Sequence, residues 1–266
     1  MDPDELRVGE ETLRKLRANP ELYFAGYSRK FGNVLNADDA ATLFDEYNQD
    51  PAKYRVAVHP AATWIRDELF RRALAERAPE GRNRVVFTAG GNAAGKSTAI
   101  SFTKDGSGAQ VVFDSTFSNP GHAQRLVDQA LAANKRITVL YVDRPLEDAF
   151  LGMLERARRE GRVVTISQLI GSHQGAAESV RHLWRDFSKD TRFQFRFVDN
   201  SGDMPRLGDI DLSTPQDYTE IGKRLYELLD TEYRAGRITE AAYHRIRRRG
   251  DSGQPAGSRP DGGGSG

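Results

Sequence analysis

Residues 85–98 read VVFTAGGNAAGKST, and the segment from Gly90 to Ser97 fits the pattern G-x-x-x-x-G-K-[ST]. A short β-branched run, Val85 to Thr88, precedes the glycines, and a helical segment follows them. This is the strand–loop–helix context that a phosphate-binding loop requires. The pattern is rare by chance because Gly makes up only about 7% of average proteins. The alternative, a glycine-rich turn with an exposed Lys, is therefore the weaker interpretation.

The residue types in this loop suit a nucleoside triphosphate. Glycines let successive backbone N–H groups turn inward, and the following helix directs its positive end at the same point. Lys96 is expected to reach the β- and γ-phosphates, and the Ser97 hydroxyl is expected to ligate magnesium. The predicted cofactors are ATP and Mg²⁺, with these cofactor-binding residues: Gly90, Gly91, Asn92, Ala93, Ala94, Gly95, Lys96, Ser97 and Thr98.

The chain around the loop alternates strand and helix patterns. Strands are predicted at residues 85–88, 110–113, 137–142 and 193–198, with helices near 96–104, 121–134, 146–160 and 166–187. Such alternation is typical of βαβ units. The expected fold class is therefore α/β, a P-loop NTPase/kinase-like doubly wound parallel sheet with an N-terminal helical region and a C-terminal helix after Pro215.

Four segments are expected along the chain: a helical N-terminal region packed on the core at 1–80, a P-loop kinase-like core at 81–235, a basic helical end at 236–250 and a disordered tail at 251–266. In the first segment, Asp38 to Tyr47 carries apolar residues at helical spacing, with Asn36 as a plausible N-cap. His59-Pro60 is expected to open a second helix. The tail is rich in Gly, Ser and Pro and has few apolar groups to bury.

Composition excludes several classes of protein. The 266 residues include 39 Lys and Arg against 38 Asp and Glu, so no overall charge favours nucleic acid or an anionic membrane. There is no Cys, which excludes disulfides and thiolate metal sites. No apolar run reaches the roughly 18 residues of a membrane span. A cytoplasmic protein without a membrane partner is expected.

Three aspartates follow predicted strands, at the edge where parallel sheets bind ligands. They are Asp114, Asp143 and Asp199. Asp114 is the first choice for a catalytic base or magnesium anchor, because its strand comes directly after the P-loop helix and Thr116 adds a hydroxyl at the same rim. The alternative is that Asp114 only caps a turn. For Asp143 and Asp199, the turn role is the better interpretation.

Arginines cluster in the run ERARREGR, residues 155–162. Arg158 and Arg162 are candidate catalytic groups, because a loop arginine beside a glycine hinge can swing towards a phosphoryl group and stabilise its charge. The alternative is a solvated helix face with internal ion pairs.

His173 could contact substrate, although a lone His is more often an ordinary polar residue. The arginines from Arg234 to Arg249 form a basic end that a solvated helix explains better than nucleic-acid binding.

Several motifs in this order resemble the zeta-toxin family of P-loop kinases, in particular its short phage and mobile-element relatives. The resemblance runs from about Asn36 to about Leu183. It rests on FTAGG (87–91) with the P-loop up to Thr98, FDSTFSN (113–119), YVDRPL (141–146), and RREGRV (158–163) followed by His173.

The resemblance implies a kinase that phosphorylates a UDP-activated amino sugar and is held inactive by an antitoxin. It implies that Lys96 and Ser97 bind ATP-magnesium, that Asp114 and Thr116 line the acceptor side, and that Arg158 and Arg162 face the phosphates. Full-length zeta toxins place a strand with a catalytic aspartate between the P-loop helix and the acidic-Thr motif. Here only Ala99 to Phe113 lies there. Three interpretations follow: Asp114 serves as the base, the acceptor differs, or the domain binds nucleotide without phosphorylating anything.

Three functions remain open at this stage. The first is an ATP-dependent phosphotransferase acting on a hydroxyl of a small molecule, with a nucleotide sugar as first candidate and an antitoxin or immunity protein as partner. The second is an ATP-binding regulatory or interaction module without transfer. The third is a nucleic-acid 5′-hydroxyl kinase, with Arg245 to Arg249 as phosphate contacts.

Overall fold

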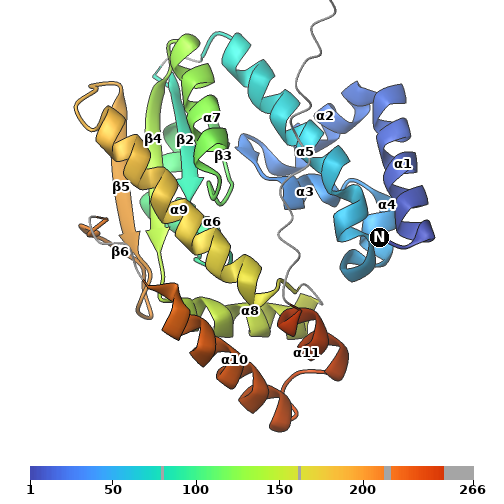
Figure 1. Ribbon diagram of the computed structural model, residues 1–266. Coiled ribbons are helices and arrows are strands. Elements are labelled where there is room, and N and C mark those ends of the chain that lie inside the picture. The colour runs from blue at the N-terminus through green and yellow to red at the C-terminus, as the bar shows by residue number, and fades with distance from the viewer. Residues whose placement is uncertain (79–80, 161–162, 213–216, 249–266) are drawn as a thin grey trace, which may run out of the picture.

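The structure, a computed structural model, describes residues 1–78, 81–160, 163–212 and 217–248. It is a mixed α/β fold with a mostly parallel sheet, as the alternating sequence patterns predict (Figure 1). The expected C-terminal helix is also present, as α10 (Tyr218–Arg234). The expected tail at 251–266 and the end of the basic segment, 249–250, lie outside the described residues.

Within the described ranges, the sheet has the strand order β1-β3-β2-β4-β5-β6. Its strands are β1 (Val34–Leu35), β2 (Arg84–Ala89), β3 (Val111–Phe113), β4 (Arg136–Asp143), β5 (Phe193–Asp199) and β6 (Arg206–Leu207). All neighbouring pairs are parallel except β5 and β6. The four strands predicted from the sequence are confirmed, while β1 and β6, of two residues each, were not predicted.

Alternating side chains of the strands contribute to two different cores. On one face, Val85, Phe87, Ile137 and Val139 belong to a cluster that also contains residues of α5 (Pro51–Ala75), α7 (Pro120–Ala132) and α9 (Ile166–Phe187). On the other face, a smaller cluster joins alternate strand residues to α6 (Lys96–Thr103) and the 3₁₀ turn η1 (Asp105–Gly108). The sheet is thus buried on both faces, as a parallel sheet requires.

The first part of the chain forms α1 (Pro3–Ala18), α2 (Pro20–Phe31), α3 (Ala37–Ala41), α4 (Asp45–Gln49) and α5. Its aromatic contact with the sheet is direct: the ring centroids of Phe70 and Phe113 lie 5.0 Å apart, and those of Phe70 and Phe87 lie 5.7 Å apart. Figure 1 shows these helices beside the β1 and β3 side of the sheet. These helices therefore cover the edge of the sheet that β1 forms.

Two local predictions in this part were wrong. His59-Pro60 does not open a helix, because α5 begins at Pro51 and continues through Pro60. Pro60 and Val56 both lie on the exposed side, where water can satisfy the carbonyl group that proline leaves without a partner. The segment Asp38–Tyr47 is also two short helices, α3 and α4, rather than one. The N-cap at Asn36 is confirmed, since its side chain accepts a hydrogen bond from the Asp38 amide.

The later helices form a separate core. It joins α8 (Leu146–Glu160), the start of α9, α10 and α11 (Glu240–Arg247) through residues such as Phe150, Leu169, Leu225 and Ile246. No helix among the described residues is long and apolar enough to cross a membrane.

Candidate active site

The P-loop follows β2 in a backbone conformation that requires glycine at two points. Gly90 has a φ of 139° and Gly95 a φ of 92°, both in the region that side chains rarely adopt. A Cβ atom on Gly90 would lie 2.6 Å from the Val142 carbonyl oxygen, and one on Gly95 would lie 2.4 Å from Nδ2 of Asn200. The loop is therefore built to approach the ends of β4 and β5 closely.

Polar side chains that follow β4 and β5 hold the loop in place. Asn200 Nδ2 donates to the Ala94 carbonyl at 2.8 Å, and Arg144 Nη1 donates to the Ala93 carbonyl at 3.1 Å. These two residues were missed by the sequence analysis, although each directly follows an aspartate, Asp143 or Asp199, that the strand-end rule had singled out. The rule found the right edge of the sheet but the wrong residues on it.

Helix α9 lies against the P-loop from the other side. The Asn92 amide donates to Ser172 Oγ at 2.9 Å, and His173 Nε2 lies 3.0 Å from the Asn92 carbonyl oxygen. A Cβ atom on Gly91 would lie 1.8 Å from Cδ2 of His173. Burial, with smaller contributions from Lys96 and Arg144, lowers the pKa of His173 to about 4, so the ring is neutral at physiological pH. Its Nε2–H can then donate to the carbonyl.

Lys96 begins α6 and is folded back over the loop. Its Nζ donates to the carbonyl oxygens of Gly90 at 3.2 Å and Gly91 at 3.1 Å. Burial lowers the pKa of Lys96, while the nearby carboxylates Asp114 and Asp38 raise it and Arg156 lowers it. Three charged groups from distant parts of the chain therefore act on this one ammonium group.

Asp114 lies at the carboxyl end of β3 and is 6% exposed. Its Oδ1 accepts from Thr88 Oγ1 at 2.7 Å, and its Oδ2 accepts from Asn36 Nδ2 at 2.7 Å. The carboxylate is thus held in place by hydrogen bonds to the P-loop strand and to the residue after β1. Such a group acts well as a fixed negative charge, but both of its oxygen atoms already have a donor.

Asp38 reaches the same edge of the sheet through β1. The pairs Val34–Val112 and Leu35–Phe113 place β1 beside β3, on the side away from the P-loop strand. The chain then enters α3, with Asp38 in its first turn and 40% of its side chain exposed. Asp38 also forms a long ion pair with Arg55, at 3.9 Å. The sequence analysis did not select Asp38, because β1 is too short to produce a strand pattern.

The sheet continues beyond β3. The position next to β3 is taken by β1, which comes from before the P-loop in the chain and not from the segment between the P-loop helix and Asp114. A second carboxylate, Asp38, is therefore available at the carboxyl edge.

Thr116 lies in the loop that follows Asp114. Its carbonyl accepts from the Gly90 amide at 3.1 Å, and its hydroxyl lies 2.9 Å from that of Ser118.

Ser97 and Thr98 are both exposed in the first turn of α6. Within the described ranges, no group of three or more His, Asp or Glu residues could hold a metal ion.

Of the two candidate catalytic arginines, Arg158 and Arg162, the structure describes Arg158. Arg158 Nη2 forms an ion pair with Glu232 at 2.7 Å, and its Nε donates to the Arg237 carbonyl at 2.6 Å. These contacts join α8 to the end of α10. Arg162 lies outside the described residues. Arg156, two positions before Arg158, is exposed and close enough to Lys96 to lower its pKa.

The other two aspartates lie side by side, as register partners on β4 and β5. Burial and the charge of Asp199 raise the pKa of Asp143. Asp143 lines a cavity of about 330 Å³ together with Tyr141 and Arg181. The Asp199 carboxylate instead accepts from the Ser201 amide at 2.9 Å, which is a turn contact.

Comparison with known proteins gives one family match. Residues 106–203 match the zeta toxin family, a range that begins after the P-loop and includes β3, β4 and β5. No characterised protein matched the sequence.

Solved structures show weaker likenesses. The AvrRxo1-ORF1:AvrRxo1-ORF2 complex with ATP is 15% identical, with a TM-score of 0.42, over 76% of this chain and 89% of that chain. A structure of the PezAT chromosomal toxin-antitoxin system of Streptococcus pneumoniae is 8% identical, with a TM-score of 0.41, over 90% of this chain and 99% of that chain. Likenesses of this size identify no substrate or partner for this chain. The match of residues 106–203 to the zeta toxin family nevertheless confirms the family resemblance that the sequence motifs indicate.

Proposed function

We propose that this chain is an ATP-dependent phosphotransferase that transfers the γ-phosphate to a hydroxyl group of a small molecule. The observation that carries the proposal is the geometry of the P-loop: Lys96 begins α6 and its Nζ donates to the Gly90 and Gly91 carbonyl oxygens, while Asp114 at the end of β3 accepts from Thr88 on the strand that leads into the loop. Asp114, Asp38 and Arg156 are the charged groups that act on the pKa of Lys96. Phosphoryl transfer needs this set of charges: a cation for the phosphates, a carboxylate for the incoming hydroxyl and a second cation for the developing charge.

The nucleotide would bind through the backbone of residues 90–98 and the first turn of α6. Inward N–H groups and the positive end of the helix favour the phosphates. Lys96 would exchange the carbonyl oxygens of Gly90 and Gly91 for phosphate oxygens, which are stronger partners for an ammonium group. Magnesium would be held by the exposed Ser97 hydroxyl, by water and by the phosphates, and would neutralise charge on the β- and γ-oxygens.

Asp38 is the better candidate for the base. A base must reach the acceptor hydroxyl, and Asp38 is part-exposed, whereas Asp114 is buried and accepts two hydrogen bonds. The acceptor oxygen would attack the γ-phosphorus as the bond to the bridging oxygen breaks, leaving ADP. The hydroxyl proton would move to the Asp38 carboxylate. Asp114 would act as a fixed negative charge beside the P-loop and hold Asn36 in position.

Arg156 takes the role that the sequence analysis gave to Arg158. It lies on the exposed side of α8 and is close enough to Lys96 to change its pKa. A guanidinium group there can stabilise charge on the equatorial oxygens of the transferring group. Arg158 would instead maintain the α8–α10 contact through Glu232.

The acceptor and the partner rest on the family resemblance alone. A UDP-amino sugar is the first acceptor to test, and an antitoxin-like protein and a cytoplasmic location belong to the same proposal.

A second function, nucleotide binding without transfer, is favoured by the contact between Asn92 and Ser172. The Asn92 amide already donates to Ser172 on α9. A phosphate that binds this amide must therefore displace Ser172 and would shift α9.

The test is transfer of labelled γ-phosphate from ATP to a metabolite pool, to a UDP-amino sugar and to a 5′-hydroxyl oligonucleotide. The proposal expects a labelled small molecule that is absent with Lys96→Ala. Label on the oligonucleotide alone would favour a nucleic-acid kinase. ATP binding without label on any acceptor would favour the binding module.

A further inference from the structure

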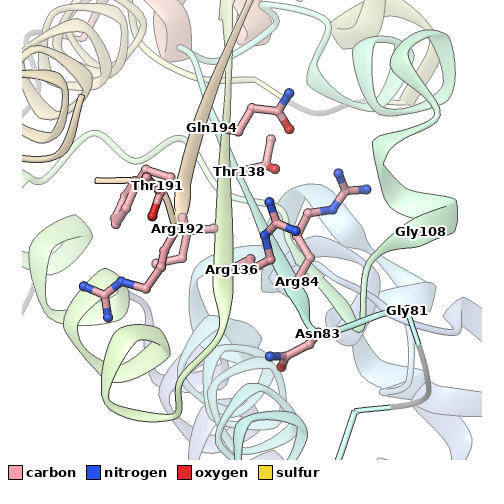
Figure 2. A pocket seen from close by; sticks show the side chains of 11 residues that line it. Gly81, Asn83, Arg84, Gly108, Arg136, Thr138, Thr191, Arg192 and Gln194 are labelled. Atoms are coloured by element: carbon pink, nitrogen blue, oxygen red, sulfur yellow. The ribbon is translucent and has the colours of Figure 1, made fainter. Parts of the chain in front are cut away.

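A second cavity lies at the opposite end of the sheet from the P-loop. It has a volume of about 550 Å³ and opens between the amino ends of β2 and β4 and the turn that enters β5 (Figure 2). Arg84, Arg136 and Arg192 line it, and none of its lining residues is an aspartate or a glutamate. Clefts of this size hold small organic ligands rather than single ions.

The arginines of this cavity are only partly balanced by carboxylates. Arg84 and Arg136 are register partners on β2 and β4, so two like charges lie directly opposite each other. Such a pair is destabilising unless a counter-charge lies nearby. The counter-charge of Arg84 is Asp105, which lies 3.7 Å from Arg84 Nη1 and 3.2 Å from Arg196 Nε. One buried carboxylate is therefore shared by two arginines.

Arg136 has no acidic partner within 4 Å in the part of the chain that the structure describes. The third lining arginine, Arg192, is paired with Asp190 at 2.7 Å. Figure 2 shows the Arg84 and Arg136 side chains next to each other. The cavity thus carries a net positive charge that comes mainly from Arg136.

A buried hydroxyl group lies in the same cavity wall. Thr138 lines the cavity and is 0% exposed, and its Oγ1 has no hydrogen-bond partner in the structure. Thr138 is two residues beyond Arg136 on β4, so both side chains lie on the same face of the sheet. Its register partner on β5, Gln194, adds an exposed amide. Because the Thr138 hydroxyl is closed off from solvent, the polar groups that a ligand can reach in this wall are the arginines and the Gln194 amide.

We infer that this cavity binds a small organic anion through a phosphate or carboxylate group. Arg84 and Arg136 would supply the forked donors that suit such groups, and the exposed Gln194 amide would add a further donor. The P-loop follows the carboxyl end of β2, whereas this cavity lies at the amino end. The site is therefore distinct from the nucleotide site, and the inference does not depend on the proposed function.

The test is calorimetric titration of the full chain with pyrophosphate and, separately, with citrate. The protein carries Lys96→Ala in every titration, so that the P-loop does not dominate the binding of pyrophosphate. Arg136→Gln removes one exposed charge at the cavity, and Arg17→Gln removes a matched exposed arginine on α1. The inference expects Arg136→Gln to weaken binding by about tenfold or more and Arg17→Gln to leave it unchanged. Binding of phosphate but not citrate, or the reverse, identifies the anionic group.

Two further variants separate recognition from general electrostatics. Arg136→Lys keeps the charge but loses the fork, so binding should again weaken. Gln194→Ala removes the exposed amide and should weaken binding without lowering the melting temperature, because an exposed side chain contributes little to packing. Equal affinity in Arg136→Gln and Arg17→Gln, or no measurable binding of either anion at millimolar concentration, would overturn the inference.

Discussion

Asn36 Nδ2 donates a hydrogen bond to Asp114 Oδ2 at 2.7 Å, across 78 positions of sequence. Asn36 follows β1 and caps α3, while Asp114 follows β3. The bond therefore ties the two strand ends together and brings the first turn of α3, with Asp38, to the edge of the sheet that carries the P-loop. The proposed acceptor side depends on this connection.

Asp38→Asn should lower phosphoryl transfer by about a hundredfold or more while leaving ATP affinity nearly unchanged. An amide cannot take the proton of the acceptor hydroxyl, but it keeps the shape of the side chain. Transfer rates and calorimetric ATP affinity check this prediction. Asp45→Asn, an exposed aspartate in the first turn of α4, is the matched control and should keep full turnover. Equal turnover in the two variants would assign the base to another residue.

Asp114→Asn should raise the magnesium concentration needed for half-maximal activity and lower turnover by on the order of tenfold to a hundredfold. The change removes a fixed negative charge that acts on Lys96 and would favour a cation beside the phosphates. The amide would also present an N–H group to one of the two donors, Thr88 or Asn36. A magnesium titration of turnover is the measurement. If Asp114 only caps a turn, Asn should replace it with little loss, since both residues suit turns.

Lys96→Ala should abolish tight ATP binding and transfer and keep the fold. The side chain contacts two loop carbonyl groups, so its loss removes little packing but leaves the phosphate charge uncompensated. Calorimetry with magnesium and circular dichroism measure the two parts of this prediction. Wild-type ATP affinity in a folded variant would contradict the P-loop interpretation.

Gly91→Ala should disturb the P-loop through His173. The added methyl group would lie 1.8 Å from the ring, closer than real atoms approach. The expected loss is about 1–3 kcal/mol of stability, together with weaker ATP binding. Combining Gly91→Ala with His173→Ala should recover part of both losses, because the clash is then removed. A double-mutant cycle with additive effects would show that the two residues do not interact.

Lowering the pH should destabilise the fold, because His173 is protonated more readily in the unfolded chain. The pKa of the folded His173 is about 4, compared with an ordinary value of 6.5, so the unfolded chain binds more protons between these values. This contribution is fully present above pH 6.5 and is lost as the pH falls from about 6.5 to 4. Its size is at most about 3 kcal/mol. Urea unfolding at several pH values, for this protein and for His173→Asn, measures this contribution to the free energy of unfolding. If the free energy of unfolding depends on pH in the same way in both proteins, the prediction is contradicted.

Local patterns in the sequence were sufficient for the core of the fold. The strand before Gly90, the glycines and Lys96 lie in one continuous stretch, and each β-branched run is long enough to show its period. The strand-end rule also found the correct edge of the sheet, since Asp114, Asp143 and Asp199 all end strands. These features depend on backbone geometry within a few residues, which a single sequence carries.

The composition of the candidate site depended on tertiary structure. β1 has two residues, too few for any pattern, so only its pairing with β3 brings Asp38 to the site. Arg158 and Arg156 are two positions apart in sequence, yet Arg158 binds Glu232 on α10, while the charge of Arg156 acts on the pKa of Lys96. Sequence spacing could not separate them, because the packing of α10 against α8 decides that Arg158 is engaged by Glu232. The sequence determined the phosphate-binding loop, and long-range pairing determined which charged groups surround it.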